Sequence, residues 1–274
     1  MIARLLAWLS DPARWAGADG IPTRLLEHLV YSVVVVLLAA AVAVPVGLLI
    51  GHTGRGKWVV TSANAARAIP SLGLLFAVAL VLGPRLSSDL AFVLPSLLVL
   101  VVLAMPPLLS GAYSGVEAVD PAARDAAYGI GMTGRQVLTG VELPCALPLV
   151  LSGVRSATLQ VVATATIASF ISLGGLGRYL VDGLASGDYA QMAGGALLVA
   201  TLALLLDGIL ALVQRRVVSP GLRLDAHPAR SRRSRRSADA TDTTSTAADT
   251  AGVAPASAPA ASTPSSSPAE RSTP

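Results

Sequence analysis

Charged residues are scarce in this chain. Only 13% of its 274 residues are Asp, Glu, Lys or Arg, whereas a soluble domain carries roughly 25%. Hydrophobic residues make up 53% of the chain, and its mean hydropathy is +0.67. This balance excludes an ordinary soluble domain and indicates a membrane protein.

Cysteine and histidine are also scarce. Cys145 is the only cysteine, which excludes an intramolecular disulfide and a cluster of thiolate metal ligands. The three histidines, His28, His52 and His227, lie near different segment boundaries and lack the spacing of metal ligands. The sequence therefore predicts no metal centre, no bound cofactor and no catalytic nucleophile, and we do not expect an enzyme.

The apolar residues are gathered in long blocks. Each block reaches the ~20 residues that a helix needs to cross the hydrocarbon core, and none alternates in polarity as a membrane strand does. Two of the blocks contain a single charge each, Arg67 and Asp207. The pattern predicts an all-α integral membrane protein with about five spans: Leu29–Ile50, Val59–Leu82, Leu90–Val116, Ser156–Gly177 and Tyr189–Val213.

The basic residues indicate how the spans are oriented. Cytoplasmic segments are enriched in Lys and Arg, and region 220–274 contains the arginine-rich run Ala229–Ser237. We therefore expect this region and loop 117–144 in the cytoplasm. The arginines would attract anionic lipid headgroups, and nucleic acid is not an expected partner. Ala238–Pro274 contains no Leu, Ile, Phe or Trp, so a disordered tail is predicted.

The first 24 residues are expected on the opposite, extracytoplasmic side. Segment 1–24 has no uninterrupted apolar core and no small-residue cleavage site, so a cleaved signal peptide is not predicted. Trp8 and Trp15 favour a short amphipathic helix at the membrane interface, where indole rings are enriched. The membrane domain then covers 25–219.

One segment imitates a nucleotide-binding motif. Gly51–Lys57 fits G-x-x-x-x-G-K, but the next residue is Trp58, where a phosphate-binding loop needs Ser or Thr to hold magnesium. The segment also joins two predicted membrane helices instead of a strand and a helix. We interpret it as a short basic cytoplasmic turn, and nucleotide binding by this chain is not expected.

Loop 117–144 contains signals for two short helices. Asp120 and Pro121 are typical of a helix start, and Gly129 and Gly131 are expected to end that helix. Thr133 and Gln136 match a capping box that starts a second helix over 134–139. Gly140 and Pro144 are expected to close it before the next span. A short helix held across the end of a bundle is suited to passing rigid-body motion into the spans.

This loop closely resembles the EAA motif of permease subunits of bacterial ABC importers. That motif reads E-A-A, three residues, G, nine residues, I-x-L-P. The chain departs from it only by a shorter carboxylate and by Val in place of Ile. The positions matching the motif are Asp125, Ala126, Ala127, Gly131, Val141, Leu143 and Pro144. The resemblance implies that these residues couple the chain to an ATP-binding subunit, where ATP is hydrolysed.

The resemblance extends over roughly Leu25–Val213. The segments Arg67–Leu75, Glu142–Thr158 and Ser172–Gly177 are similar to permeases for glycine betaine, carnitine and choline, and less closely to methionine importers. The family implies a type I importer fold in the bacterial cell membrane. It also implies three partners: an ATP-binding cassette subunit, a second permease subunit (a copy of this chain or a paralogue), and an extracytoplasmic solute-binding protein.

Polar and flexible positions within the spans are candidates for the solute path. Asp207 lies deep in the last span, where it could contact solute, pair with another helix or mark the inner interface. Gly174, Gly175 and Gly177 allow either a tight turn near the pore mouth or a simple connector. Arg67 and Arg155 are expected near cytoplasmic helix ends, where their side chains can reach the interface. A secondary transporter remains an alternative, although Asp207 is its only candidate proton carrier.

Aromatic residues are few, and this bears on substrate capture. A quaternary ammonium ligand is best held by an aromatic cage. The chain has eleven aromatic residues, and no two lie at helical spacing within one predicted span. The only phenylalanines are Phe76, Phe92 and Phe170. We therefore expect high-affinity capture to belong to the separate binding protein, with the permease offering a low-affinity path.

Overall fold

The computed structural model describes residues 2–86, 90–171 and 173–218. Every regular element in these ranges is a helix, which confirms the all-α class. The described residues belong to one compact unit, Met1–Arg223. The predicted disordered tail, 220–274, lies outside the described residues.

Four helical stretches are long and apolar enough to cross a membrane, and a bent helix pair makes a fifth span if counted as one. The pair consists of Lys57–Ala68 and Ser71–Arg85. The number of predicted spans is thus confirmed, although their bounds differ. The four unbroken stretches are Ile21–Thr53, Val93–Glu117, Gly134–Ile171 and Tyr189–Val217.

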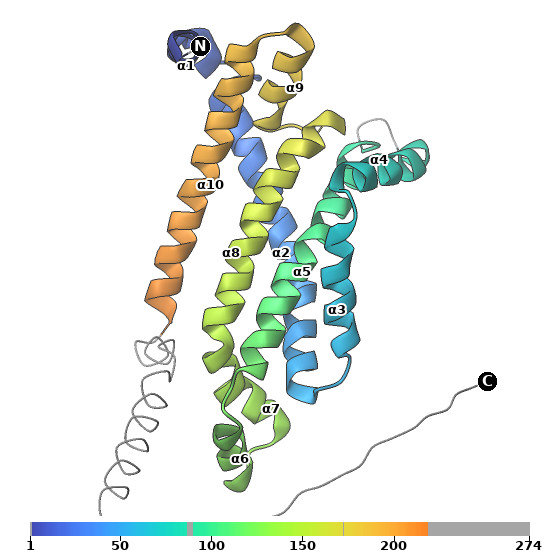
Figure 1. Ribbon diagram of the computed structural model, residues 1–274, viewed down its shortest axis with the longest axis vertical. Coiled ribbons are helices and arrows are strands. Elements are labelled where there is room, and N and C mark those ends of the chain that lie inside the picture. Colours follow the sequence, from blue (N-terminus) through green and yellow to red (C-terminus); the bar gives the residue numbers. More distant parts are fainter. Residues whose placement is uncertain (1, 87–89, 172, 219–274) are drawn as a thin grey trace, which may run out of the picture. The chain divides into compact units, whose positions relative to one another are not determined.

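The helices follow one another along the chain with short connections, and Figure 1 shows their arrangement. Helices α1 and α9 lie at one end of the bundle, and α6 and α7 lie at the other. The helices are α1 (Ile2–Ser10), α2 (Ile21–Thr53), α3 (Lys57–Ala65), α4 (Ser71–Leu82), α5 (Val93–Glu117), α6 (Pro121–Gly129), α7 (Gly134–Val137), α8 (Leu143–Ala168), α9 (Gly177–Ser186) and α10 (Tyr189–Val217).

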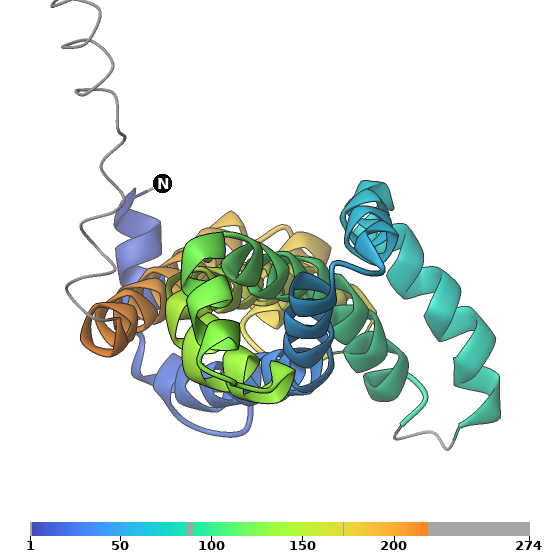
Figure 2. The same cartoon turned by 90° about the horizontal axis from the view of Figure 1, so that it is seen from below.

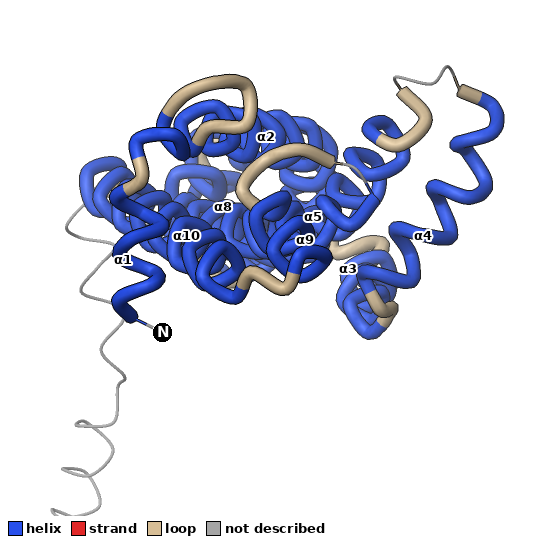
Figure 3. The backbone as a smooth tube through the Cα atoms, turned by 90° about the horizontal axis from the view of Figure 1, so that it is seen from above, coloured by secondary structure: helices blue, strands red, loops and turns tan. Residues whose placement is uncertain are grey.

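The second predicted span is broken, not straight. Its two parts meet at an angle of 95°, and α4 leaves the bundle, as Figures 2 and 3 show. The cause is Pro70, because proline has no N–H and disfavours the helical region for the residue before it. Ile69 accordingly has φ −72° and ψ 127°. The predicted span Val59–Leu82 is therefore divided at Pro70 into two helices, α3 and α4.

Helices α2, α5 and α8 pack around small residues. A Cβ atom on Gly111 of α5 would lie 2.9 Å from the Cα atom of Gly153 on α8, and one on Gly47 of α2 would lie 2.7 Å from the carbonyl oxygen of Leu109. Side chains larger than hydrogen would push these backbones apart. Small residues at such contacts let membrane helices approach closely.

The predicted N-terminal helix is present as α1, but Trp8 does not lie free at an interface. Its side chain is 6% exposed and meets the Tyr179 ring edge-on at 5.3 Å between centroids. The Arg14 guanidinium lies 5.4 Å from the Trp8 ring centre. Of the two tryptophans in the first 24 residues, only Trp15 is exposed. Trp8 therefore packs α1 against α9 and α10. This tertiary contact could not be predicted from the spacing of residues within the first 24 positions.

Candidate functional site

The first half of the motif loop folds as the sequence predicts. The Asp120 carboxylate accepts a hydrogen bond from the Ala122 N–H at 2.9 Å and caps α6, with Pro121 at its first position. The helix ends at Gly129, and Gly131 follows with φ +88°. The Gly131 N–H donates to the Tyr128 carbonyl at 2.9 Å. This left-handed turn redirects the chain toward α7.

The second half differs from the prediction after a correct start. The capping box is present, and the Thr133 N–H donates to the Gln136 side chain at 2.8 Å. Gly140 and Pro144, however, do not end the helix. A π-helical turn, Leu138–Glu142, carries it directly into α8. The wider turn changes the register of the backbone hydrogen bonds where Pro144 has no N–H to give, and a single helical glycine costs only about 1 kcal/mol.

The motif residues lie together at the α6–α7 end of the bundle (Figure 1). Ala127 is buried, and Val141 and Leu143 are partly buried. The exposed members are Asp125, Ala126, Gly131 and Pro144. Beside them Ile130 is 80% exposed and Tyr128 is 48% exposed. The loop therefore presents an apolar and acidic edge, while its other side chains pack inward.

Glu142 is the residue that sequence reasoning missed at this site. Its side chain is 2% exposed, and one oxygen lies 2.7 Å from the His52 Nδ1 atom. The other oxygen forms an ion pair with the Arg124 Nε atom at 2.9 Å, and the Arg124 guanidinium also donates to the Val116 carbonyl. A buried carboxylate needs such partners. Glu142 thus ties the π turn to the last turn of α2 and to α6.

The sequence held only a weak signal for this Glu142 cluster. Glu142 is the unspecified position of the V-x-L-P motif ending, and His52 stands 90 residues earlier, in the last turn of α2. The Gly51–Lys57 segment around that turn joins α2 to α3 through Gly54, as expected for a turn between helices. Among the described residues, no group of three or more His, Cys, Asp or Glu side chains is placed to hold a metal ion.

Asp207 lies on α10, far along the chain from the motif loop, and its side chain contacts α8. Its carboxylate is bonded to the Arg155 guanidinium through two contacts, one of them at 2.5 Å from the Arg155 Nη2 atom. The expectation that Arg155 lies at a cytoplasmic helix end was wrong, because it lies within α8. Two opposite charges held together avoid much of the cost of a lone charge in lipid.

This pair allows a direct test of Asp207. We expect Asp207→Asn and Arg155→Gln to lower the melting temperature individually, since each leaves one charge without its partner. The double variant Arg155→Gln/Asp207→Asn should recover much of that loss and should transport solute. The measurements are thermal unfolding and uptake. A stable double variant without transport would instead place Asp207 in the solute path.

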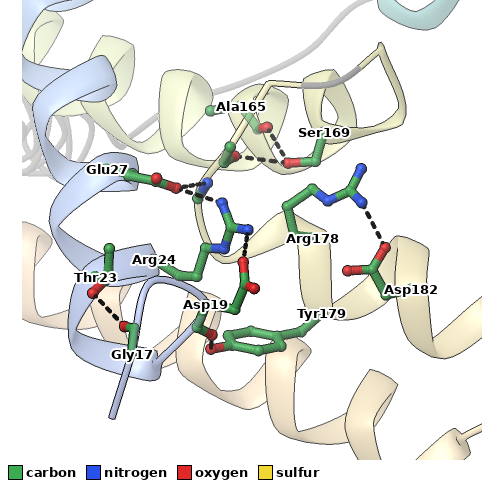
Figure 4. Close-up of polar contacts among 12 residues, drawn as sticks. Gly17, Asp19, Thr23, Arg24, Glu27, Ala165, Ser169, Arg178, Tyr179 and Asp182 are labelled. Carbon is green, nitrogen blue, oxygen red and sulfur yellow. Dashed lines mark hydrogen bonds and ion pairs between the residues drawn. The ribbon is translucent and has the colours of Figure 1, made fainter. Parts of the chain in front are cut away.

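The predicted glycine loop lies beside α9 at the α1–α9 end of the bundle (Figure 1), and Figure 4 shows the polar contacts around it. Gly175, with φ +88°, donates its N–H to the Glu27 carboxylate at 2.8 Å. Glu27 also accepts from Arg24 at 2.9 Å, and the Ser169 hydroxyl donates to the Gly174 carbonyl at 3.1 Å. Gly177 packs against Ser169. These contacts with α2 and with the short turn after α8 account for the glycines, and the structure does not bring them together with Asp207.

The three phenylalanines converge although no two share a predicted span. Phe76 of α4, Phe92 before α5 and Phe170 after α8 line one cavity of about 520 Å³. Each of these side chains is about half exposed. Spacing along a single helix could not show this grouping, because the rings come from three separate segments.

A multi-span helical bundle with a capped loop continuous with one of its spans defines a membrane-embedded transport subunit. The chain belongs to the family of binding-protein-dependent transport system inner membrane components, which matches residues 43–219. It is accordingly a multi-pass protein of the inner membrane, in a family of ABC importer permeases that are not themselves enzymes.

Known relatives share most of the chain. It is 34% identical to the glycine betaine/carnitine/choline transport system permease protein OpuCB of Bacillus subtilis, over 72% of this chain and 88% of the relative. It is 32% identical to the osmoprotectant import permease protein OsmW of Salmonella typhimurium, over 72% and 91%. In fold it is similar to a chain of the inward-facing MetNI methionine ABC transporter, with a TM-score of 0.63 and 21% identity, covering 77% of this chain and 100% of that chain.

Proposed function

We propose that this chain forms, with a second permease subunit, the membrane path of an ATP-driven importer for a small osmoprotectant of the glycine betaine, carnitine and choline class. The relatives that align with most of the chain are named as permeases for such solutes. The observation that carries the proposal is the intact motif loop, which runs without a break into α8. That arrangement is suited to receiving force from another subunit.

The coupling step follows from the shape of the loop. The exposed edge with Asp125, Ala126 and Ile130 docks against an ATP-binding subunit, where ATP is hydrolysed. Displacement of α7 then moves α8, because Gly134–Ile171 is one helical stretch. The Glu142 cluster passes the same displacement to α2 and α6. This chain provides the membrane path and the helices that move, and the ATP-binding subunit provides the free energy of ATP hydrolysis.

The orientation assigns one partner to each end of the bundle. The α6–α7 end faces the cytoplasm and the ATP-binding subunit, in accordance with the arginines that follow α10. The α1–α9 end faces outward and receives solute from a binding protein. Inward transport follows from this arrangement, since a binding protein delivers solute to an outward-facing path.

The proposal is tested by uptake in a strain that lacks its own osmoprotectant importers. The chain is produced with its ATP-binding subunit and binding protein, and uptake of labelled glycine betaine, carnitine, choline and methionine is measured. We expect accumulation of at least one of the first three, abolished when the phosphate-loop lysine of the ATP-binding subunit is replaced. Accumulation of methionine alone would indicate an amino-acid importer. Uptake without the ATP-binding subunit, lost when the proton gradient collapses, would indicate a secondary transporter.

A further inference from the structure

Arg67 is a charge within a membrane span that has no counter-charge. It lies at the bend between α3 and α4, not at a cytoplasmic helix end as its sequence position suggested. Its side chain is exposed, and it forms no hydrogen bond or ion pair with any residue that the structure describes. An arginine at the bilayer centre costs about 2.5–3.5 kcal/mol when it faces lipid. Arg67 therefore requires water, another subunit or a solute beside it.

A polar row on α3 leads to Arg67. Lys57, Thr61, Asn64 and Arg67 recur at the spacing of one helical face, and all four are exposed. Lipid-facing surfaces of a span are normally apolar. This α3 polar row is therefore turned toward water or protein.

Helix α5 supplies matching polar groups beside this row. The Asn64 side chain donates to the Ser110 hydroxyl at 3.0 Å. At the end of the row near the α2–α3 turn, the Lys57 ammonium lies 2.9 Å from the Glu117 carboxylate, which also accepts from Tyr113 at 2.7 Å. Lys57, Thr61 and Asn64 of the α3 polar row thus each have a hydrogen-bond or ion-pair partner. Within this row and among the described residues, only Arg67 has none.

Arg67 lines a cavity. The cavity measures about 420 Å³, within the range of small-molecule sites. Non-helical backbone at the bend forms one wall, which membrane proteins tolerate where it lines a cavity. Gln160 and Thr164 of α8 form the opposite wall, and the Gln160 amide is fixed by a hydrogen bond to the Leu103 carbonyl at 2.9 Å. The polar lining residues are Arg67, Ser71, Gln160 and Thr164.

We propose that this Arg67 cavity is a low-affinity solute site that receives the carboxylate of a zwitterionic osmoprotectant. An arginine guanidinium binds a carboxylate through two parallel hydrogen bonds. Glycine betaine and carnitine both carry a carboxylate, whereas choline carries a hydroxyl group and only positive charge. The site therefore favours the two zwitterions and disfavours choline. This inference rests on the proposed function, because it names which solutes of that class the membrane path prefers.

The test compares solutes within one variant. In the assembled importer, Arg67→Gln should lower uptake of glycine betaine and carnitine by about tenfold or more, as expected for loss of a charge-assisted hydrogen bond. Choline uptake should stay the same or rise. Arg67→Lys keeps the charge and should retain part of the zwitterion uptake. Arg4→Gln removes an exposed arginine on α1 and serves as the charge-matched control.

ATP hydrolysis by the purified complex in nanodiscs is measured for the same variants. Unchanged basal hydrolysis shows that Arg67→Gln still assembles. An equal loss for all three solutes would overturn the inference and point to a contact with the second permease subunit. Undiminished zwitterion uptake, or a wild-type preference for choline, would overturn it as well. If the wild-type importer carries none of the three solutes, the proposed function itself fails.

Discussion

Replacing Gly131 with proline is expected to abolish solute uptake while the protein remains in the membrane. Gly131 has φ +88°, whereas proline is fixed near −65°. The substitution also removes the N–H that donates to the Tyr128 carbonyl. Backbone strain of this kind costs roughly 1–3 kcal/mol, so a loss of at least about tenfold in uptake is expected once α6 is displaced from α7.

Gly129→Ala is the matched control for this variant. Gly129 ends α6, and a Cβ atom added there meets no atom within 4 Å. Its uptake should stay near that of the wild type. Uptake is measured together with the amount of protein in the membrane fraction and the recovery of the ATP-binding subunit in pull-down. Normal uptake by Gly131→Pro would show that this turn does not take part in coupling.

Replacing Glu142 with glutamine is expected to have the largest effect on stability. The Glu142 side chain is 2% exposed and contacts both His52 and Arg124. Loss of its charge leaves the largely buried Arg124 guanidinium, which is 24% exposed, without a counter-charge. Removing one partner of a buried ion pair typically lowers the free energy of unfolding by about 3–5 kcal/mol.

Asp182→Asn provides the comparison for Glu142→Gln. Asp182 forms an ion pair with Arg178 at 2.8 Å on the surface of α9, where its side chain is 47% exposed. Surface pairs contribute about 0–1 kcal/mol, so this variant should unfold close to the wild type. Both variants are purified in the same detergent, and unfolding is followed by circular dichroism. Equal shifts for the two would mean that the Glu142 cluster contributes no more than a surface pair.

Local signals in the sequence predicted local structure well. Asp120 with Pro121, and Thr133 with Gln136, each fix a helix start through contacts within a few residues, and the structure contains both caps. The apolar blocks likewise gave the number of spans, because a span can be identified from the length and composition of one continuous segment. The motif loop could therefore be located and largely folded from its own residues.

Contacts between distant segments could not be predicted in this way. His52, one of the two partners of Glu142, lies 90 residues away on α2, and Asp207, the partner of Arg155, lies 52 residues away on α10. Arg155 considered alone suggested an interfacial position, and nothing near Glu142 in the sequence indicated that its side chain is buried. The continuous passage through Gly140 and Pro144 was missed as well, since both residues often end helices and the sequence does not show the π turn that joins α7 to α8.

Helices α2, α5 and α8 touch backbone to backbone at Gly47, Gly111 and Gly153. Because these backbones are already in contact, we expect the three helices to move as one unit and to keep their mutual spacing during transport. Pairs of spectroscopic labels on these helices should therefore show the same distance in every state of the transport cycle. Helix α4, which leaves the bundle after the bend at Pro70, is free of that constraint.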